Sequence, residues 1–207
     1  MNSREKILSQ VKANKPPVLP LPAIPVFPID TERFVKIQKF RTILEGIGGK
    51  LVEVDNYAEI SVILSAQKQQ GMKVACLCPA IGEGNMNITA RQSAAELETI
   101  DTAYISASFG VAENGSVWIY ESRFINRLLP FICQHLVILL DPETILSDMH
   151  EAYRFIEVDK EGYGLFIAGP SKTADIEQSL VIGAHGARSC TVYLVSERES
   201  DISKKLK

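Results

Sequence analysis

The sequence predicts an α/β protein built around a parallel sheet. Helical periodicity and short apolar, strand-like runs alternate in the order helix, strand, helix, strand between residues 30 and 78. This alternation is typical of parallel α/β sheets. The 207 residues favour one core over two. Hydrophobic residues make up 46% and charged residues 23% of the chain, which is ordinary usage for a soluble globular protein.

The first 29 residues differ in character from the rest of the chain. Ser3 to Ala13 predicts a short helix, whose apolar face consists of Ile7, Leu8 and Val11. Six of the ten prolines lie between residues 16 and 28, which predicts an extended, polyproline-like tether. We therefore expect residues 1–29 to be separate from a domain at 30–207. Two interpretations of the helix stay open: it packs on a partner or a neighbouring subunit, or it is a loosely ordered arm.

Two helices and two strands are expected at the start of the domain. The first helix follows Asp30, a suitable N-cap, and ends at Gly48–Gly49, before a strand at residues 51–54. Its core-facing residues recur at helical spacing and are Phe34, Ile37, Phe40, Leu44 and Ile47. The capping-box pair Asn56 and Glu59 opens the second helix. This helix points Ile60, Ile63 and Leu64 inward, ends at Gly71 and precedes a strand at residues 73–78.

The second half of the domain is expected to contain a hairpin, three more strands and further helices. Residues 102–109 and 116–120 are strand-like and flank Asn114-Gly115, a strong tight-turn signal whose tip presents Glu113. The remaining expected elements are a long loop from 79 with a helix at 91–97, a strand at 136–140, a helix at 142–156, and closing strands at 165–168 and 191–195.

Charge and cysteine usage exclude several function classes. The formal net charge of −3 argues against a nucleic-acid or anionic-membrane surface. No apolar run approaches the length of a membrane span, and residues 1–15 lack a signal-peptide core, so we expect a cytoplasmic protein. Cys76 and Cys78 are expected on one face of a strand, as a metal or redox pair or, as we favour, as small apolar fillers. Zinc and iron–sulfur spacings are absent, so no metal site and no cluster is expected in this chain.

The segment from Gly169 to Gln178 has an unusual density of polar groups between two apolar runs. Asp175 and Gln178 have capping-box spacing, which predicts a short helix from Ile176 to Gly183. The preceding Ser171, Lys172 and Thr173 would then lie at a helix N-terminus, which favours an anion. The spacing matches neither a Walker loop nor a dinucleotide fingerprint. The alternative interpretation, which the spacing leaves equally open, is a capped turn with solvated polar groups.

Three further side chains are candidates for chemistry. His185 lies between Gly183 and Gly186, so it is either a general base or ligand partner, or a turn histidine bonded to backbone. Glu113 is either a nucleophile, base or acceptor, or a solvated tip carboxylate. Arg123 and Arg127 can each pair with a carboxylate substrate through two hydrogen bonds, or can equally lie on the polar face of a short helix. Arg127 fits the polar face of a short helix better, and His135 and His150 are assigned to structure.

Several of these segments together resemble the LUD domain family, as found in lactate utilization protein C. The segments that carry the resemblance are Phe109–Ser116, Leu129-Pro130, Gly169–Glu177, Gly183-Ala184-His185-Gly186, the strand Val192–Val195, and the N-terminal helix with its proline tether. The resemblance covers essentially the whole chain. It departs from the family at Ala187, where the family often has proline, and at Asn114, where it often has threonine.

The resemblance implies a fold, a role and a site. The fold is a three-layer, Rossmann-like α/β sheet similar to the NagB/RpiA/CoA-transferase superfamily. The role is that of a subunit supporting oxidation of L-lactate to pyruvate alongside iron–sulfur partner proteins. The expected site joins the Glu113 turn to the Gly169–Gly186 block. Its catalytic residues are Glu113 and His185, and its ligand-binding residues are Asn114, Gly115, Arg123, Gly169, Pro170, Ser171, Lys172, Thr173, Asp175, Glu177 and Gly186.

Two other functions stay open. Ala112-Glu113-Asn114-Gly115 resembles the Ser-Glu-Asn-Gly turn of class I CoA-transferases, in which the glutamate forms an acyl anhydride. A chain that used Glu113 in this way would be an acyl-CoA enzyme, although shared ancestry can preserve shape without chemistry. The other possibility is a small-anion binding module that uses Ser171 to Thr173. A homo-oligomer is compatible with each of these functions.

Overall fold

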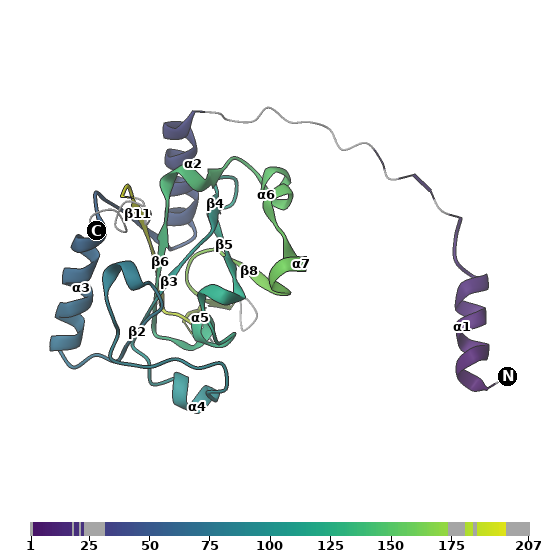
Figure 1. Ribbon diagram of the computed structural model, residues 1–207. Helices are drawn as coiled ribbons and strands as arrows, with labels where there is room; N and C mark the ends of the chain where they lie inside the picture. Colours follow the sequence, from purple (N-terminus) through teal and green to yellow (C-terminus); the bar gives the residue numbers. More distant parts are fainter. Residues whose placement is uncertain are drawn as a thin grey trace.

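A parallel sheet of five strands forms the centre of the protein, as the sequence predicts (Figure 1). The computed structural model describes residues 2–17, 19–20, 22, 32–173, 181–183 and 186–197. The strand order is β1-β11-β6-β3-β2, and every neighbouring pair is parallel. The bounds are β1 Lys50–Val54, β2 Val74–Cys76, β3 Thr102–Ser106, β6 His135–Leu140 and β11 Ser189–Val195.

The two faces of this sheet are covered by different elements. Side chains alternate along each strand, so Ala103 and Ile105 of β3 face one side while Tyr104 faces the other. The helix α3, Tyr57–Gln69, packs Ile60 and Leu64 on the Tyr104 side. The helix α2, Arg33–Gly46, packs on the opposite side, together with a second sheet. The capping box expected at Asn56 and Glu59 is present at the start of α3.

The second sheet is mixed and has the strand order β7-β4-β5-β8. Its bounds are β4 Phe109–Val111, β5 Ser116–Tyr120, β7 Ile145–Leu146 and β8 Gly164–Ile167. Val117 and Ile119 of β5 belong to the core shared with the parallel sheet. Trp118 lies on the other face, where its ring contacts Phe109 and Phe166 beside the helix α6, Met149–Phe155. The described chain is therefore layered as helix, sheet, sheet and helix.

The helix predicted over residues 142–156 is wrong. Pro142–Thr144 forms the 3-10 turn η3, Ile145–Leu146 forms β7, and α6 begins only at Met149. Ile145–Leu146 pairs with Gly110–Val111 of β4, so a contact remote in sequence overrides the local helical pattern. The run at residues 102–109 is also divided, because β3 ends at Ser106 and Phe109 begins β4 in the other sheet.

Four smaller expectations need correction. The helix α2 begins at Arg33 with Glu32 as its N-cap, in place of Asp30. Phe34 is 73% exposed and Ile63 is 38% exposed, so neither faces the core. The strand expected at residues 73–78 is limited to Val74–Cys76.

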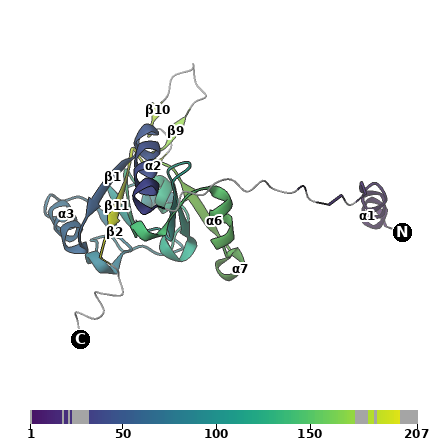
Figure 2. The same cartoon turned by 90° about the horizontal axis from the view of Figure 1, so that it is seen from above.

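The remaining described elements are short. They are α1 Ser3–Ala13, η1 Pro79–Ile81, α4 Ala94–Leu97, η2 Glu121–Arg123, α5 Leu129–Ile132, α7 Val158–Glu161, and the hairpin strands β9 Lys172–Thr173 and β10 Val181–Ile182. The helix α1 begins with a capping box at Asn2 and buries none of its residues. Figures 1 and 2 show it apart from the rest of the described chain. Among the described residues no helix is both long and apolar enough to cross a membrane.

Candidate functional site

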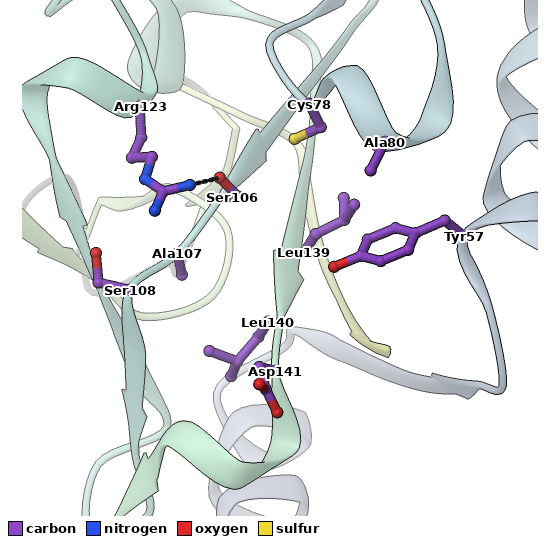
Figure 3. Close-up of a pocket in the computed structure, with 10 residues that line it drawn as sticks. All are labelled: Tyr57, Cys78, Ala80, Ser106, Ala107, Ser108, Arg123, Leu139, Leu140 and Asp141. Atoms are coloured by element: carbon purple, nitrogen blue, oxygen red, sulfur yellow. Dashed lines mark hydrogen bonds between the residues drawn. The ribbon is translucent and has the colours of Figure 1, made fainter. Parts of the chain in front are cut away.

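A cavity opens at the carboxyl ends of β3 and β6 (Figure 3). Its volume is about 260 Å³. Ligands of open α/β sheets bind at this edge, where the loops that follow the strands converge. The lining residues are Tyr57, Cys78, Ala80, Ser106, Ala107, Ser108, Arg123, Leu139, Leu140 and Asp141. The cavity is therefore of a size and in a position that suit a small ligand.

Arg123 supplies the positive charge of this cavity. It ends the 3-10 turn η2, which follows β5 of the second sheet. Its Nη1 donates a hydrogen bond to Ser106 Oγ at 2.9 Å, which fixes the guanidinium against β3 (Figure 3). Within the described part of the chain, no carboxylate forms an ion pair with Arg123. The remaining donors of the guanidinium are thus available to an anionic ligand.

The nearby Arg127, in contrast to Arg123, forms an ion pair with a carboxylate of the same segment. Its Nε and Nη2 donate to the two carboxylate oxygens of Glu121 at 2.7 and 2.9 Å. This hydrogen bonding lowers the pKa of the Glu121 carboxyl. The guanidinium also stacks over the ring of Tyr163 at 4.4 Å. Arg127 is therefore occupied by protein groups, whereas Arg123 is held in place but keeps free hydrogen-bonding capacity.

The polar groups in the cavity are side chains rather than backbone. The amides of Ala107 and Ser108 donate to Leu139 O and Trp118 O, at 2.9 and 2.8 Å. The Asp141 carboxylate accepts a hydrogen bond from the Glu143 amide at 2.9 Å. A bound carboxylate would therefore meet the guanidinium and the serine hydroxyls, which can donate to it, whereas the Asp141 carboxylate can accept a hydrogen bond only from a hydroxyl of the ligand.

The Glu113 turn lies away from this cavity. Glu113 Oε2 accepts a hydrogen bond from the Met149 amide at 2.9 Å, at the start of α6. Asn114 Oδ1 accepts from the amide and the hydroxyl of Ser116, at 3.0 and 2.6 Å. Gly115 has φ +67°, and a Cβ there would lie 2.8 Å from Leu44 N of α2. In this structure Glu113 ties the turn to α6, Asn114 holds its fold, and Gly115 lets it approach α2.

The described part of the Gly169–Gly186 block forms a hairpin. Lys172–Thr173 pairs with Val181–Ile182 as β9 and β10, so the helix predicted to run to Gly183 is wrong at its C-terminal end. Ser171 N donates to Ala187 O, and Gly183 N donates to Ser171 O, each at 2.9 Å. Lys172 and Thr173 therefore lie in a strand, and the predicted start of the helix at Ile176 falls outside the described residues. Asp175, Glu177 and His185 lie outside the described residues, as does the side chain of Thr173.

The block and the Glu113 turn meet the same helix. Gly169 has φ +71°, and a Cβ there would lie 3.2 Å from Ile47 O, just after α2. A second depression of about 300 Å³ includes Gly169, Pro170, Ser171, Lys172 and Gly186 in its lining. Because Arg188 N donates to Gln134 O at 2.8 Å, the block lies beside the amino ends of β6 and β11. The predicted site residues thus fall into two groups, and Arg123 is at the opposite edge of the sheet.

Comparison with known proteins identifies the family. Residues 7–195 match the family model of the LUD domain. The chain belongs to the LUD domain family. This LUD domain is 29% identical to lactate utilization protein C of Geobacillus kaustophilus over 126 residues, covering 58% of the chain and 49% of that protein. The match to lactate utilization protein C of Shouchella clausii is 28% over 118 residues, covering 54% and 51%. The chain therefore spans about half the length of these relatives.

Two further similarities extend over more of the LUD domain. An uncharacterized protein of Neisseria meningitidis serogroup B is 24% identical, and the match covers 94% of each chain. A crystal structure of a DUF162 family protein from Deinococcus radiodurans superposes with a TM-score of 0.60. It is 16% identical, and the match covers 80% of this chain and 99% of that chain. This second similarity supports the α/β fold.

None of the four cysteines of the LUD domain forms a disulfide. Burial raises the pKa of the Cys133 and Cys190 thiols to about 12, so both are protonated at neutral pH. Cys78 is also buried, whereas Cys76 is partly exposed and lies near Gly82 O at 3.2 Å. Within the described residues, no three potential metal ligands come together. Cys78 packs in the core and Cys76 packs partly buried against it, as the small fillers that we favoured for this pair, and Cys133 and Cys190 are buried in the larger core cluster.

Most of the cavity residues escaped sequence reasoning. Arg123 was selected for its guanidinium, but Ser106, Ser108 and Asp141 were not selected. These three residues have one feature in common that indicates a binding site. Each lies at or just after the carboxyl end of a strand of the parallel sheet. The rule that ligands bind at this edge would have found them, once the strand ends were known.

Proposed function

We propose that this LUD domain serves lactate utilisation by binding a small carboxylate, of the size of lactate or pyruvate, in the Arg123 cavity. The observation that carries the proposal is the position of Arg123. Its guanidinium is hydrogen-bonded to Ser106 and lacks a carboxylate partner among the described residues. Bidentate pairing with a carboxylate is the strongest interaction open to such a group. The names of the relatives from Geobacillus kaustophilus and Shouchella clausii support the lactate assignment.

We further propose that the domain acts alongside iron–sulfur partner proteins, which would carry the electrons released when lactate is oxidised. The fold class would be that of the NagB/RpiA/CoA-transferase superfamily. A layered α/β core with its cavity at the carboxyl edge of a parallel sheet supports this assignment. Under this proposal the domain binds and presents the carboxylate, and the redox chemistry belongs to the assembled system.

Calorimetric titration of the purified chain with L-lactate and with pyruvate tests the binding step. Saturable binding by the wild type is expected. The Arg123→Ala variant should bind about 10- to 100-fold more weakly, because a hydrogen bond to a charged group contributes about 1.5–3 kcal/mol. Arg127→Ala is the matched control, since Arg127 lies in the same segment but pairs with Glu121. Equal loss in both variants, or no binding by the wild type, would contradict the proposal.

The partner step has a separate test. The chain alone should not reduce an artificial electron acceptor with L-lactate. Addition of candidate iron–sulfur partner proteins should give lactate-dependent reduction that requires Arg123. Turnover by the isolated chain would show that the domain is itself the dehydrogenase, and the partner assignment would then be wrong.

A further inference from the structure

The segment that follows Arg123 contains a strained residue. Ile125 has φ +60°, and among the described residues it is the one residue other than glycine that has a positive φ. A β-branched side chain in this left-handed region is a conformational outlier. Helices commonly place glycine at the corresponding position beyond their C-terminus. Here the amide of Ile125 donates to Glu121 O at 3.1 Å, so the strained residue ends the 3-10 turn that carries Arg123.

Burial of Ile125 does not explain the strain, because its side chain is 41% exposed. The neighbours on either side are deeply buried instead. Phe124 is 0% exposed and Asn126 is 4% exposed. The left-handed residue lets the chain direct both of these side chains into the protein. Such strain persists where the surroundings hold it, and it concentrates at functional sites.

Asn126 holds the turn through three hydrogen bonds. Its Nδ2 donates to Thr89 O and Gln92 O, each at 3.1 Å, and its Oδ1 accepts from Leu128 N at 3.0 Å. The first two bonds tie the turn to the loop between β2 and β3. Arg123 is therefore restrained at both ends, by the Asn126 turn at its backbone and by Ser106 Oγ at its guanidinium.

We infer that Asn126 is a positioning residue for the anion site, and that it holds the strained turn at Ile125 so that Arg123 faces the cavity. This inference rests on the proposed function, since it assigns Asn126 a part in carboxylate binding. Without the side chain of Asn126, Ile125 relaxes to negative φ and turns Arg123 away from Ser106. An arginine displaced by about 1 Å or more loses bidentate geometry, and such misplacement reduces binding strongly.

The test measures affinity for L-lactate together with thermal midpoint in four proteins of full length. Asn126→Ala should bind about tenfold more weakly than wild type. Asn85→Ala is the matched control: Asn85 also bonds to backbone, through Met72 O and Val74 N at 2.8 and 2.7 Å, but it does not line the cavity. Its midpoint should fall while its affinity stays that of wild type.

The fourth protein adds Ile125→Gly to Asn126→Ala. Glycine adopts φ +60° without strain, so the double variant should recover part of the lost affinity. A purely structural role of Asn126 would not give this recovery. Should Asn126→Ala yield too little folded protein, Asn126→Ser, which keeps one donor, is measured in its place.

The possible results distinguish the positioning role of Asn126 from the proposed binding of a carboxylate. If the wild type binds and Asn126→Ala binds equally well, the positioning role is overturned while the proposed function stands. If Asn126→Ala weakens binding and the double variant does not recover affinity, the part assigned to strain at Ile125 is overturned. If the wild type does not bind lactate or pyruvate, both proposals fail.

Discussion

The Gly115→Ala substitution asks whether this glycine is retained for packing or for a ligand. Gly115 has φ +67°, and a Cβ would lie 2.8 Å from Leu44 N and 3.0 Å from Leu44 Cα. Both atoms belong to the backbone of α2, so neither can move aside as a flexible side chain does. The hairpin tip would have to shift away from the helix, which would weaken the docking of the second sheet.

The expected cost has two parts. Placing a Cβ in the left-handed region costs about 1–2 kcal/mol. Forcing an extra carbon into a close-packed contact costs about 1–3 kcal/mol. We expect Gly115→Ala to lower the free energy of unfolding by about 2–5 kcal/mol. Gly71→Ala should lower it by about 1–2 kcal/mol, because Gly71 has φ +80° but nothing lies within 4 Å of its Cβ position.

Urea denaturation followed by linear extrapolation measures both variants. The difference between them isolates the close approach of the hairpin tip to α2, since both carry the same backbone penalty. Free energies of unfolding that agree within about 0.5 kcal/mol, the usual effect of a neutral surface change, would refute the packing argument. A loss of lactate affinity in a stably folded Gly115→Ala variant would show instead that Gly115 belongs to the ligand site, as the sequence predicted.

Three further predictions concern titratable and nucleophilic groups. Burial raises the folded-state pKa of Cys133 and Cys190 to about 12, from the ordinary thiol value of 9.0. Above about pH 9 the unfolded state therefore loses these protons first, and stability should fall between about pH 9 and 12. Replacing both by alanine should flatten that part of a pH–stability curve. Iodoacetamide at pH 8 should modify Cys76 in the folded protein and spare the buried pair, as peptide mass spectrometry would reveal. Acyl-CoA should leave no adduct on Glu113, whose carboxylate accepts the Met149 amide; an adduct there would establish the acyl-transfer alternative.

The elements that could be predicted from the sequence are those whose signals lie in neighbouring residues. The capping box at Asn56 and the apolar spacing through Ile37, Phe40 and Leu44 gave two helices, because cap and core contacts both follow from neighbouring residues. The strand β7 was missed for the opposite reason. Its two residues have no strand signal of their own and pair with β4, about 35 residues earlier in the chain. Phe34 has helical spacing, but its side chain is 73% exposed, so no described element buries it.

The site was harder to predict than the fold. Residue chemistry pointed to the Gly169–Gly186 block, because it concentrates polar groups between apolar strands. In the described part of that block, however, the backbone pairs as β9 and β10 and joins β8 to the amino edge of the sheet. Little in the sequence indicated the Arg123 cavity, because its polar side chains come from four separate segments of the chain. These segments contain Tyr57, Ser106 with Ser108, Arg123, and Asp141. Only the order of the strands shows that these segments converge.

The cavity also links ligand binding to the docking of the two sheets. Ser106 and Asp141 follow strands of the parallel sheet, whereas Arg123 follows β5 of the second sheet. Neither sheet alone can form the site, so a ligand held between them favours the docked arrangement over any opened state. At a lactate concentration 100 times the dissociation constant, the stabilisation would be about 2.7 kcal/mol. The hydrogen bond from Arg123 to Ser106 is one of the contacts that join the two sheets at the cavity. Loss of Arg123 should therefore reduce the thermal shift produced by lactate together with the affinity for lactate.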